Sequence, residues 1–164
     1  MNNKNGVNKA AELCSHIKKA DTSLSKIISI IEQQALPVAH ELFRENIGKS
    51  QKLSKSLSAL IATGNNQHAR FMKLIDMLNR SAEMNKIPET LDKTNHKGDK
   101  LITELRATES RLDNYILITK NKNGIAGVRA SCKSCAAALT KHIAEFEADA
   151  EKIKNFFNTN GKED

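Results

Sequence analysis

The chain has few of the residues that build β-sheets. Its 164 residues include no Trp, one Tyr and five Phe, so aromatic residues make up only 4%. It also holds only two Pro and seven Gly, although sheet proteins need frequent turns besides aromatic and β-branched residues. These shortages disfavour a sheet, and the abundant Ala, Leu, Lys and Glu favour helices.

Long apolar runs and paired cysteines are also scarce. No segment approaches the ~18 consecutive apolar residues of a membrane helix, so we expect no membrane span. The first residues lack the apolar stretch of a secretory signal, and three Cys are too few for a disulfide scaffold. We expect a cytoplasmic protein, or one secreted without a recognisable signal peptide. The frequent Lys and Asn suggest a bacterial source.

The apolar residues that are present recur with a helical period. In the first segment they alternate in steps of three and four, at Ala10, Leu13, Ile17, Ala20, Leu24, Ile27 and Ile31. This spacing keeps one narrow stripe facing a partner helix, as in a coiled coil. Because similar stripes follow along the chain, we predict an all-α fold. Its architecture would be an antiparallel helical bundle of four to five helices with coiled-coil-like seams.

Helix boundaries are predicted from Pro, Gly and Asn. We expect helices over 8–34 and 38–62. At Pro37, between them, we expect a kink or tight corner, and a kink would elongate the bundle. The alternative is a turn at this proline. Residues 63–66, which include one Gly and two Asn, give the strongest signal for a boundary.

The next predicted helix carries His68, Phe71, Ile75, Leu78 and Ala82 on its apolar stripe. Two further helices should follow in the rest of the chain. Pro88 fits the first turn of a helix that reaches about residue 119, although its polar segment 94–98 could be a loose turn. The last helix should cover about 126–157. In this interpretation residues 8–158 form a single bundle, and 1–7 and 159–164 are disordered.

Cys132 and Cys135 form the only recognisable short motif. Redox-active cysteine pairs need a thiolate at an open helix N-terminus, whereas these two occupy successive apolar positions of the last predicted helix. We therefore predict core residues, with a thiol-based redox switch as the alternative. Covalent haem attachment needs a His after the second Cys, where Ala136 stands, so we expect no cofactor.

Other signatures of catalysis or metal binding are missing from the sequence. The five His are one to a predicted helix, so no pair at i and i+4 could share a metal ion. There is no Gly-x-Ser-x-Gly turn and no Gly-rich phosphate loop. We expect neither a metal nor an enzymatic activity.

The net charge of +7 favours acidic partners, such as nucleic acid, an anionic membrane or an acidic protein. The excess is spread along the sequence, with +4 over 1–62, +2 over 63–120 and +1 over 121–164. The candidate polyanion-binding residues are Arg44, Lys49, Lys52 and Lys55. The alternative interpretation of this cluster is an ordinary solvated helix face.

The leading functional hypothesis is a non-enzymatic protein–protein interaction module, that is, an adaptor, scaffold or secreted effector-like factor. Its partner would be another protein or a second copy of the chain. Ile28 and Ile30 widen the stripe of the first helix and are the candidate partner-facing residues. The alternatives are a basic helical protein that binds nucleic acid or another polyanion, and the redox switch through Cys132 and Cys135.

Overall fold

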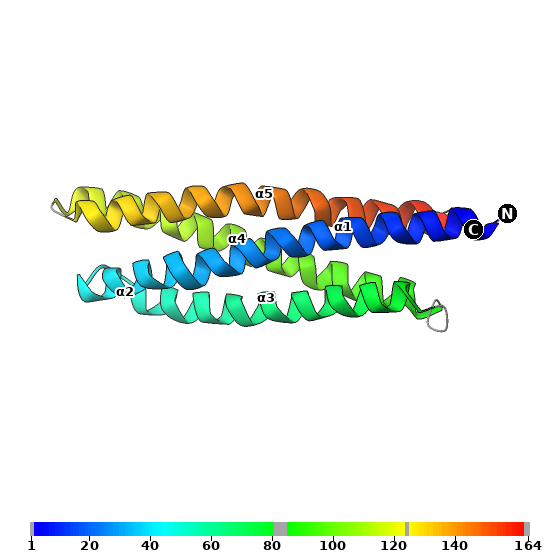
Figure 1. The fold of residues 1–164 in the computed structure, drawn as a ribbon. Coiled ribbons are helices and arrows are strands. Elements are labelled where there is room, and N and C mark those ends of the chain that lie inside the picture. Colours follow the sequence, from blue (N-terminus) through cyan, green and yellow to red (C-terminus); the bar gives the residue numbers. More distant parts are fainter. Residues whose placement is uncertain (1, 81–84, 124, 163–164) are drawn as a thin grey trace.

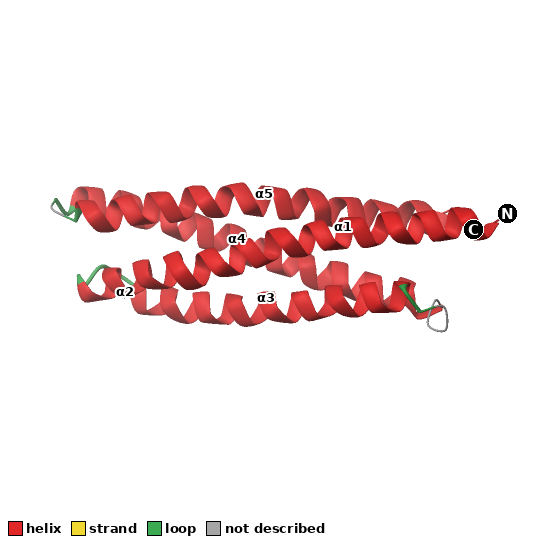
Figure 2. Ribbon diagram, in the orientation of Figure 1, coloured by secondary structure: helices red, strands yellow, loops and turns green. Residues whose placement is uncertain are grey.

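A computed structural model describes the backbone of residues 2–80, 85–123 and 125–162, and the side chains of 9–80, 85–123 and 125–155. Every regular element in these ranges is a helix, which confirms the all-α prediction (Figures 1 and 2). The elements are α1 (Asn2–Ile30), η1 (Ile31–Ala35), α2 (Leu36–Arg44), α3 (Ser50–Leu78), α4 (Ile87–Asn121) and α5 (Ala126–Lys162).

The helices form four long rods, of which α1, η1 and α2 together make the first. Successive rods run in opposite directions, so the predicted antiparallel bundle is confirmed (Figure 1). The first rod and α4 each pack against both α3 and α5, while the backbones of diagonal pairs do not come close to each other within the described ranges. The α2–α3 and α4–α5 turns therefore lie at one end of the bundle, which we call the turn end, opposite the termini.

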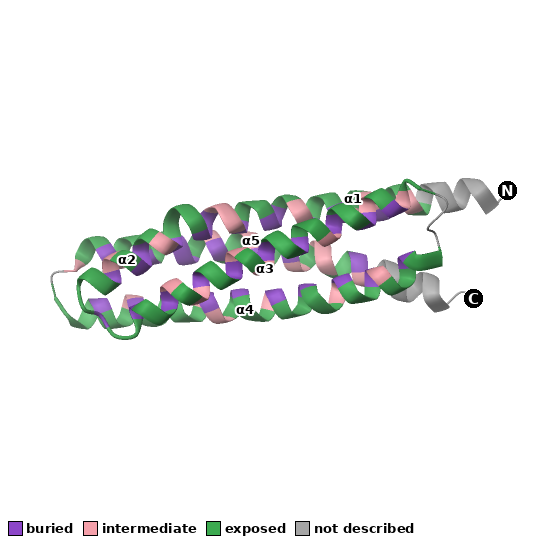
Figure 3. Cartoon of the chain, turned by 90° about the horizontal axis from the view of Figure 1, so that it is seen from below, coloured by how far each residue is buried: buried purple, intermediate pink, exposed green. Residues whose placement is uncertain are grey.

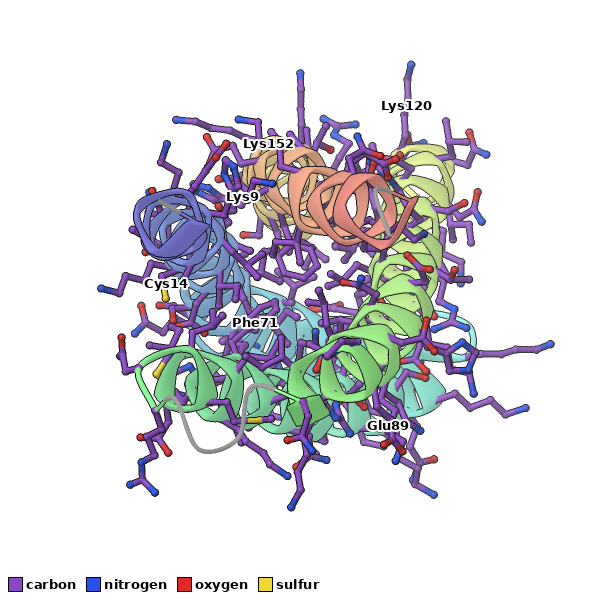
Figure 4. All side chains as sticks on the ribbon, turned by 90° about the vertical axis from the view of Figure 1, so that its right-hand side faces the viewer. Lys9, Cys14, Phe71, Glu89, Lys120 and Lys152 are labelled. Atoms are coloured by element: carbon purple, nitrogen blue, oxygen red, sulfur yellow. The ribbon has the colours of Figure 1, made fainter. Side chains whose placement is uncertain are left out.

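The core lies on the central axis between the rods, where buried side chains follow the predicted stripes (Figure 3). Buried positions in α4 alternate in steps of four and three throughout, at Ile87, Leu91, Thr94, Gly98, Leu101, Leu105, Thr108, Leu112, Tyr115 and Thr119. Viewed end-on, Phe71 points into the bundle, whereas Lys120 and Lys152 point outward (Figure 4). The ring centroid of Phe71 lies 6.3 Å from that of Phe146, a fully buried residue of α5.

The chain continues as a helix through Pro37. Proline has no N–H and its ring clashes with the carbonyl four residues earlier, which breaks a regular α-helix. Here the π-helical turn η1 precedes it, with the Leu36 N–H bonded to the Ile31 carbonyl. Pro37 then falls in the first turn of α2, where an N–H is not needed. The alternative of a turn at this proline is therefore wrong, and the helix continues as the preferred interpretation expected.

The first reversal comes instead at residues 45–49, so the predicted helix over 38–62 is wrong. Asn46 and Gly48 adopt the left-handed φ angles of 55° and 48°, which end α2 and turn the chain back. Ile47 between them is fully buried and fixes the turn to the core. In the last turn of α2, Leu42 takes the core position and Phe43 is 56% exposed.

The predicted boundary at residues 63–66 is also wrong, because α3 runs through it without a break. Gly64 is buried against α1, and a Cβ there would lie 3.0 Å from the Ile28 side chain. Gly in a helix interior costs about 1 kcal/mol relative to Ala. That cost is offset by the packing of a 29-residue helix along its whole length.

The stripe of α3 includes a polar residue that the sequence pattern missed. Gln67 is 1% exposed and donates to the Thr94 carbonyl oxygen of α4 at 3.2 Å. His68, predicted on the stripe, is exposed instead and lies 2.6 Å from an Asp21 carboxylate oxygen of α1. Of the other predicted positions, Ala82 lies outside the described residues.

Residues 94–98 of α4, predicted as a possible loose turn, are regular helix. Thr94 satisfies its hydroxyl by donating to the Thr90 carbonyl oxygen at 2.7 Å. Gly98 is buried opposite Gln67, and a Cβ there would lie 3.3 Å from the amide nitrogen of that residue. Thr94 and Gly98 interrupt the apolar pattern of this segment because they pack closely against α3.

No helix in the described ranges is long and apolar enough to cross a membrane. The backbone of α1 begins at Asn2 and that of α5 ends at Lys162. The side chains of 1–8 and 156–164 lie outside the described residues, and the disorder expected at 1–7 and 159–164 stays a prediction.

Candidate anion-binding groove

A groove opens on the bundle surface between the first turns of α3 and the last turns of α4. It has a volume of about 510 Å³, within the range of ordinary ligand sites. We call it the basic groove. Its lining residues are Gly48, Lys49, Lys52, Leu53, Ser56, Arg111, Asn114, Tyr115 and Ile118.

The charged groups of the basic groove are all cationic. Lys49 and Lys52 come from the start of α3, and Arg111 comes from α4 on the opposite side. Within the described side chains no carboxylate lines the groove, and none of these three cations forms an ion pair. Because three like charges face one another across an open space, an anion between them would be attracted from both walls.

The floor of the groove is mainly apolar. Leu53 is 2% exposed and Tyr115 is 9% exposed, while Ile118 at the rim is 40% exposed. Burial raises the pKa of the Tyr115 phenol, and the nearby Arg111 lowers it by less, so the net direction is upward. The phenol is therefore protonated at neutral pH and can donate a hydrogen bond to an anion.

The backbone at the start of α3 adds to the positive potential. The helix begins at Ser50, and its first turn holds no acidic residue to offset the positive end of the helix dipole. The Lys52 N–H bonds the Lys49 carbonyl at 3.0 Å. Neither Ser50 nor Gln51 makes such a bond among those described at this turn, so their N–H groups add to the positive end of the helix dipole.

The structure separates the four residues predicted to bind polyanions. Lys49 and Lys52 line the basic groove, whereas Lys55 is exposed outside it. Arg44, at the end of α2, is held by an ion pair with Glu41. Arg111, Asn114 and Tyr115 were missed because they lie about 60 residues further along the chain, where no local pattern links them to α3.

Folding also gathers charge that the sequence spreads out. The turn end is built from residues 36–56 and 108–133 (Figure 1). The first of these holds four Lys or Arg and two Glu, and the second holds five Lys or Arg and two acidic residues. This end therefore carries +5 of the net charge of +7, because the antiparallel rods bring two moderately basic segments together.

The other predicted functional residues lie in the core. Ile30 is 8% exposed and Ile28 is half-buried, and both pack in the hydrophobic core, Ile28 also beside Gly64. Cys132 and Cys135 are fully buried and free, as predicted for core residues. Burial raises the pKa of each thiol to about 11. Reactive thiols need exposure and a lowered pKa, so this arrangement gives the redox alternative no support.

A second cleft of about 550 Å³ lies between α3, α4 and α5, nearer the other end. The Lys154 ammonium and the Asp99 carboxylate at its edge pair with each other at 2.8 Å. Glu147 is likewise held by Arg106 at 2.6 Å. These charges are already paired, so they offer less to a ligand than the free cations of the basic groove.

No group of three His, Cys, Asp or Glu in the described part of the chain is placed to hold a metal ion. Comparisons of the whole chain with protein families, curated proteins and solved structures found no match.

Proposed function

We propose that this chain is a non-enzymatic helical-bundle protein that binds anionic groups, phosphate above all, in the basic groove. The observation that carries the proposal is the convergence of Lys49, Lys52 and Arg111 around one groove without a carboxylate partner. Lys supplies a point charge for phosphate, and Arg adds a planar fork of donors that matches its oxygens. Among the described side chains, no His or carboxylate lines the groove, so its charged groups are all suited to holding an anion.

The described residues give more support to polyanion binding than to a protein–protein interaction module. Ile28 and Ile30, which motivated that module, contribute to the core and leave no apolar strip on α1. The module stays a prediction without an assigned surface. Specific single-strand nucleic-acid readers stack bases on exposed aromatic rings. Tyr115 is 91% buried, so the groove favours recognition of phosphate groups over bases.

The proposal is tested by calorimetry with a soluble, phosphate-rich probe, inositol hexakisphosphate. We expect binding that weakens as NaCl rises from about 20 to about 200 mM, because the attraction is mainly electrostatic. Lys52→Glu should weaken it about tenfold or more. Lys73→Glu makes the same charge change on an exposed residue of the same helix, outside the groove, and should change the affinity less than about twofold.

Two results would contradict the proposal. One is the absence of measurable binding at the lowest salt concentration. The other is an equal loss of affinity in Lys52→Glu and Lys73→Glu, because that would indicate a response to net charge alone. Both residues are exposed, so circular dichroism should confirm that each variant keeps the helical fold of the unchanged chain.

A further inference from the structure

Large apolar side chains are exposed mainly at the turn end of the bundle. Four are exposed in the described part of the chain, and Phe43, Leu117 and Ile118 are three of them, with exposed fractions of 56%, 61% and 40%. Phe43 lies in the last turn of α2, and the other two lie near the end of α4. Figure 1 places both helix ends beside the turns at the same end of the bundle. The fourth, Met72, lies in α3 away from that end.

The same end carries the basic groove and +5 of the net charge of +7. A soluble phosphate or a nucleic-acid backbone would be attracted to the cationic side chains. It would offer no apolar surface against which an exposed Phe or Leu could be buried. The surface of an anionic bilayer offers both partners, because negative headgroups lie directly above the acyl chains. Cationic side chains flanked by a few apolar ones are the combination that binds peripherally to such a surface.

The shape of the molecule fits an end-on contact. The four rods run lengthwise, and the turns at 45–49 and 122–125 close the turn end, while α1 begins and α5 ends at the far end (Figure 1). Phe43 and Leu117 belong to the first rod and to α4, whose backbones do not come close to each other among the described residues. The exposed apolar residues therefore come from opposite corners of the bundle, so contact through both would hold the rods upright on a surface.

We propose that the turn end docks peripherally on an anionic lipid bilayer, with lipid phosphates in the basic groove and Phe43 and Leu117 at the headgroup–acyl boundary. This inference rests on the proposed function, because it names lipid headgroups as the source of the anion. Docking of this kind needs no membrane-spanning helix.

The test is co-sedimentation with vesicles of phosphatidylcholine alone and of phosphatidylcholine with roughly 30% phosphatidylglycerol. We expect binding to the anionic vesicles only. The variant with Phe43→Ser and Leu117→Ser should bind them about fivefold or more weakly, yet bind inositol hexakisphosphate within about twofold of the unchanged chain. Met72→Ser removes an exposed apolar side chain away from the turn end and should change neither affinity. Ile118 stays unchanged throughout because it lines the groove.

The outcomes separate the two proposals. Binding of inositol hexakisphosphate without binding of anionic vesicles would overturn the membrane inference and leave the proposed function standing. Full vesicle binding by the double Ser variant would also overturn it, because apolar contact would then play no part. Preference for a DNA duplex over vesicles would overturn it in favour of nucleic acid. Failure to bind either the soluble probe or vesicles would overturn both proposals.

Discussion

Cys132 and Cys135 occupy core-facing positions of α5, and neither thiol is accessible to solvent. The first effect on their acidity is desolvation, which disfavours the charged thiolate and raises the pKa of each to about 11 from an ordinary 9.0. At this scale a residue type that is reactive in other proteins behaves as a small apolar side chain. The apolar surroundings of each thiol therefore decide its acidity and reactivity.

These raised pKa values predict a loss of stability at alkaline pH. Between the ordinary pKa of 9.0 and the folded value of about 11, the unfolded chain binds fewer protons than the folded one. The free energy of unfolding must therefore fall as the pH rises through this window, by on the order of 3 kcal/mol per thiol in total. Below this window the thiols should contribute no pH dependence.

Urea unfolding near pH 8 and near pH 10, with a reductant present, measures the effect. Lysines also titrate in this range, so the control is the double variant Cys132→Ala and Cys135→Ala. That variant should lose less stability over the same interval. An identical loss in both proteins would mean that the thiols do not titrate with the raised pKa.

At the scale of the element, glycines have opposite roles in different parts of the chain. Gly64 lies in the middle of α3 and allows close approach of α1, whereas Gly48 adopts a left-handed conformation that ends a rod. The sequence predicted a break at Gly64 and a continuous helix over 38–62, which includes Gly48. The break occurs only at Gly48, where Asn46 also adopts a positive φ and Ile47 is buried in the core.

Two glycines with open space around them allow a test of this backbone argument. A Cβ at Gly48 or at Gly127 would meet nothing within 4 Å, but only Gly48 has a positive φ. Gly48→Ala should therefore destabilise the bundle by about 1–2 kcal/mol, the usual cost of a left-handed L-residue. Gly127→Ala, near the start of α5, should be neutral or stabilise it by up to about 1 kcal/mol.

Thermal and urea unfolding of the two single variants give the comparison. No effect of Gly48→Ala would contradict the assignment of the chain reversal to the left-handed backbone at 45–49. Destabilisation by Gly127→Ala would contradict the helical backbone at the start of α5. Because neither Cβ would touch another atom, a change in packing cannot explain either result.

Among the described side chains, two ion pairs link α4 to α5 on the surface of the bundle. Between α4 and α5, Arg106 pairs with Glu147 at 2.6 Å and Lys154 pairs with Asp99 at 2.8 Å. These exposed pairs are worth little individually. They do favour the observed antiparallel register of α4 and α5, because a shift of one helix along the other would separate both pairs.

At the scale of the whole molecule, antiparallel packing produces a rod with two unlike ends. The turn end combines the basic groove, most of the net charge and three exposed apolar side chains. Both proposals concern this end. They depend on the chain reversals at 45–49 and 122–125, which bring the start of α3 and the end of α4 together.

The elongated shape predicts the scattering of the protein in solution. A compact domain of this length has a radius of gyration of about 15 Å. The longest single helix has 37 residues, and at 1.5 Å per residue a bundle of such rods should give about 18–20 Å. Small-angle X-ray scattering at several concentrations, with mass taken from the forward scattering, should give this value for one chain. A value near 15 Å for a monomer would contradict four full-length rods.

The fold class and most of the core follow from local patterns of residues. Apolar side chains that return every three or four residues can be buried together only on one face of a helix, so the stripes at Leu13, Leu57, Leu105 and Leu139 became the core. Pro88 correctly marked the first turn of α4. These features depend on short stretches of chain, which is why a local pattern was sufficient to predict them.

The ends of the rods and the grouping of charges depend instead on packing between helices. Gly64 was accommodated inside a helix because α1 packs against it, and Gly48 became a turn because Ile47 could be buried there. Lys49 and Lys52 were recognised as candidates, but Arg111 and Tyr115 joined them through contact between helices far apart in the sequence. Such contacts follow from the packing energy of the whole bundle, which no local stretch of residues contains.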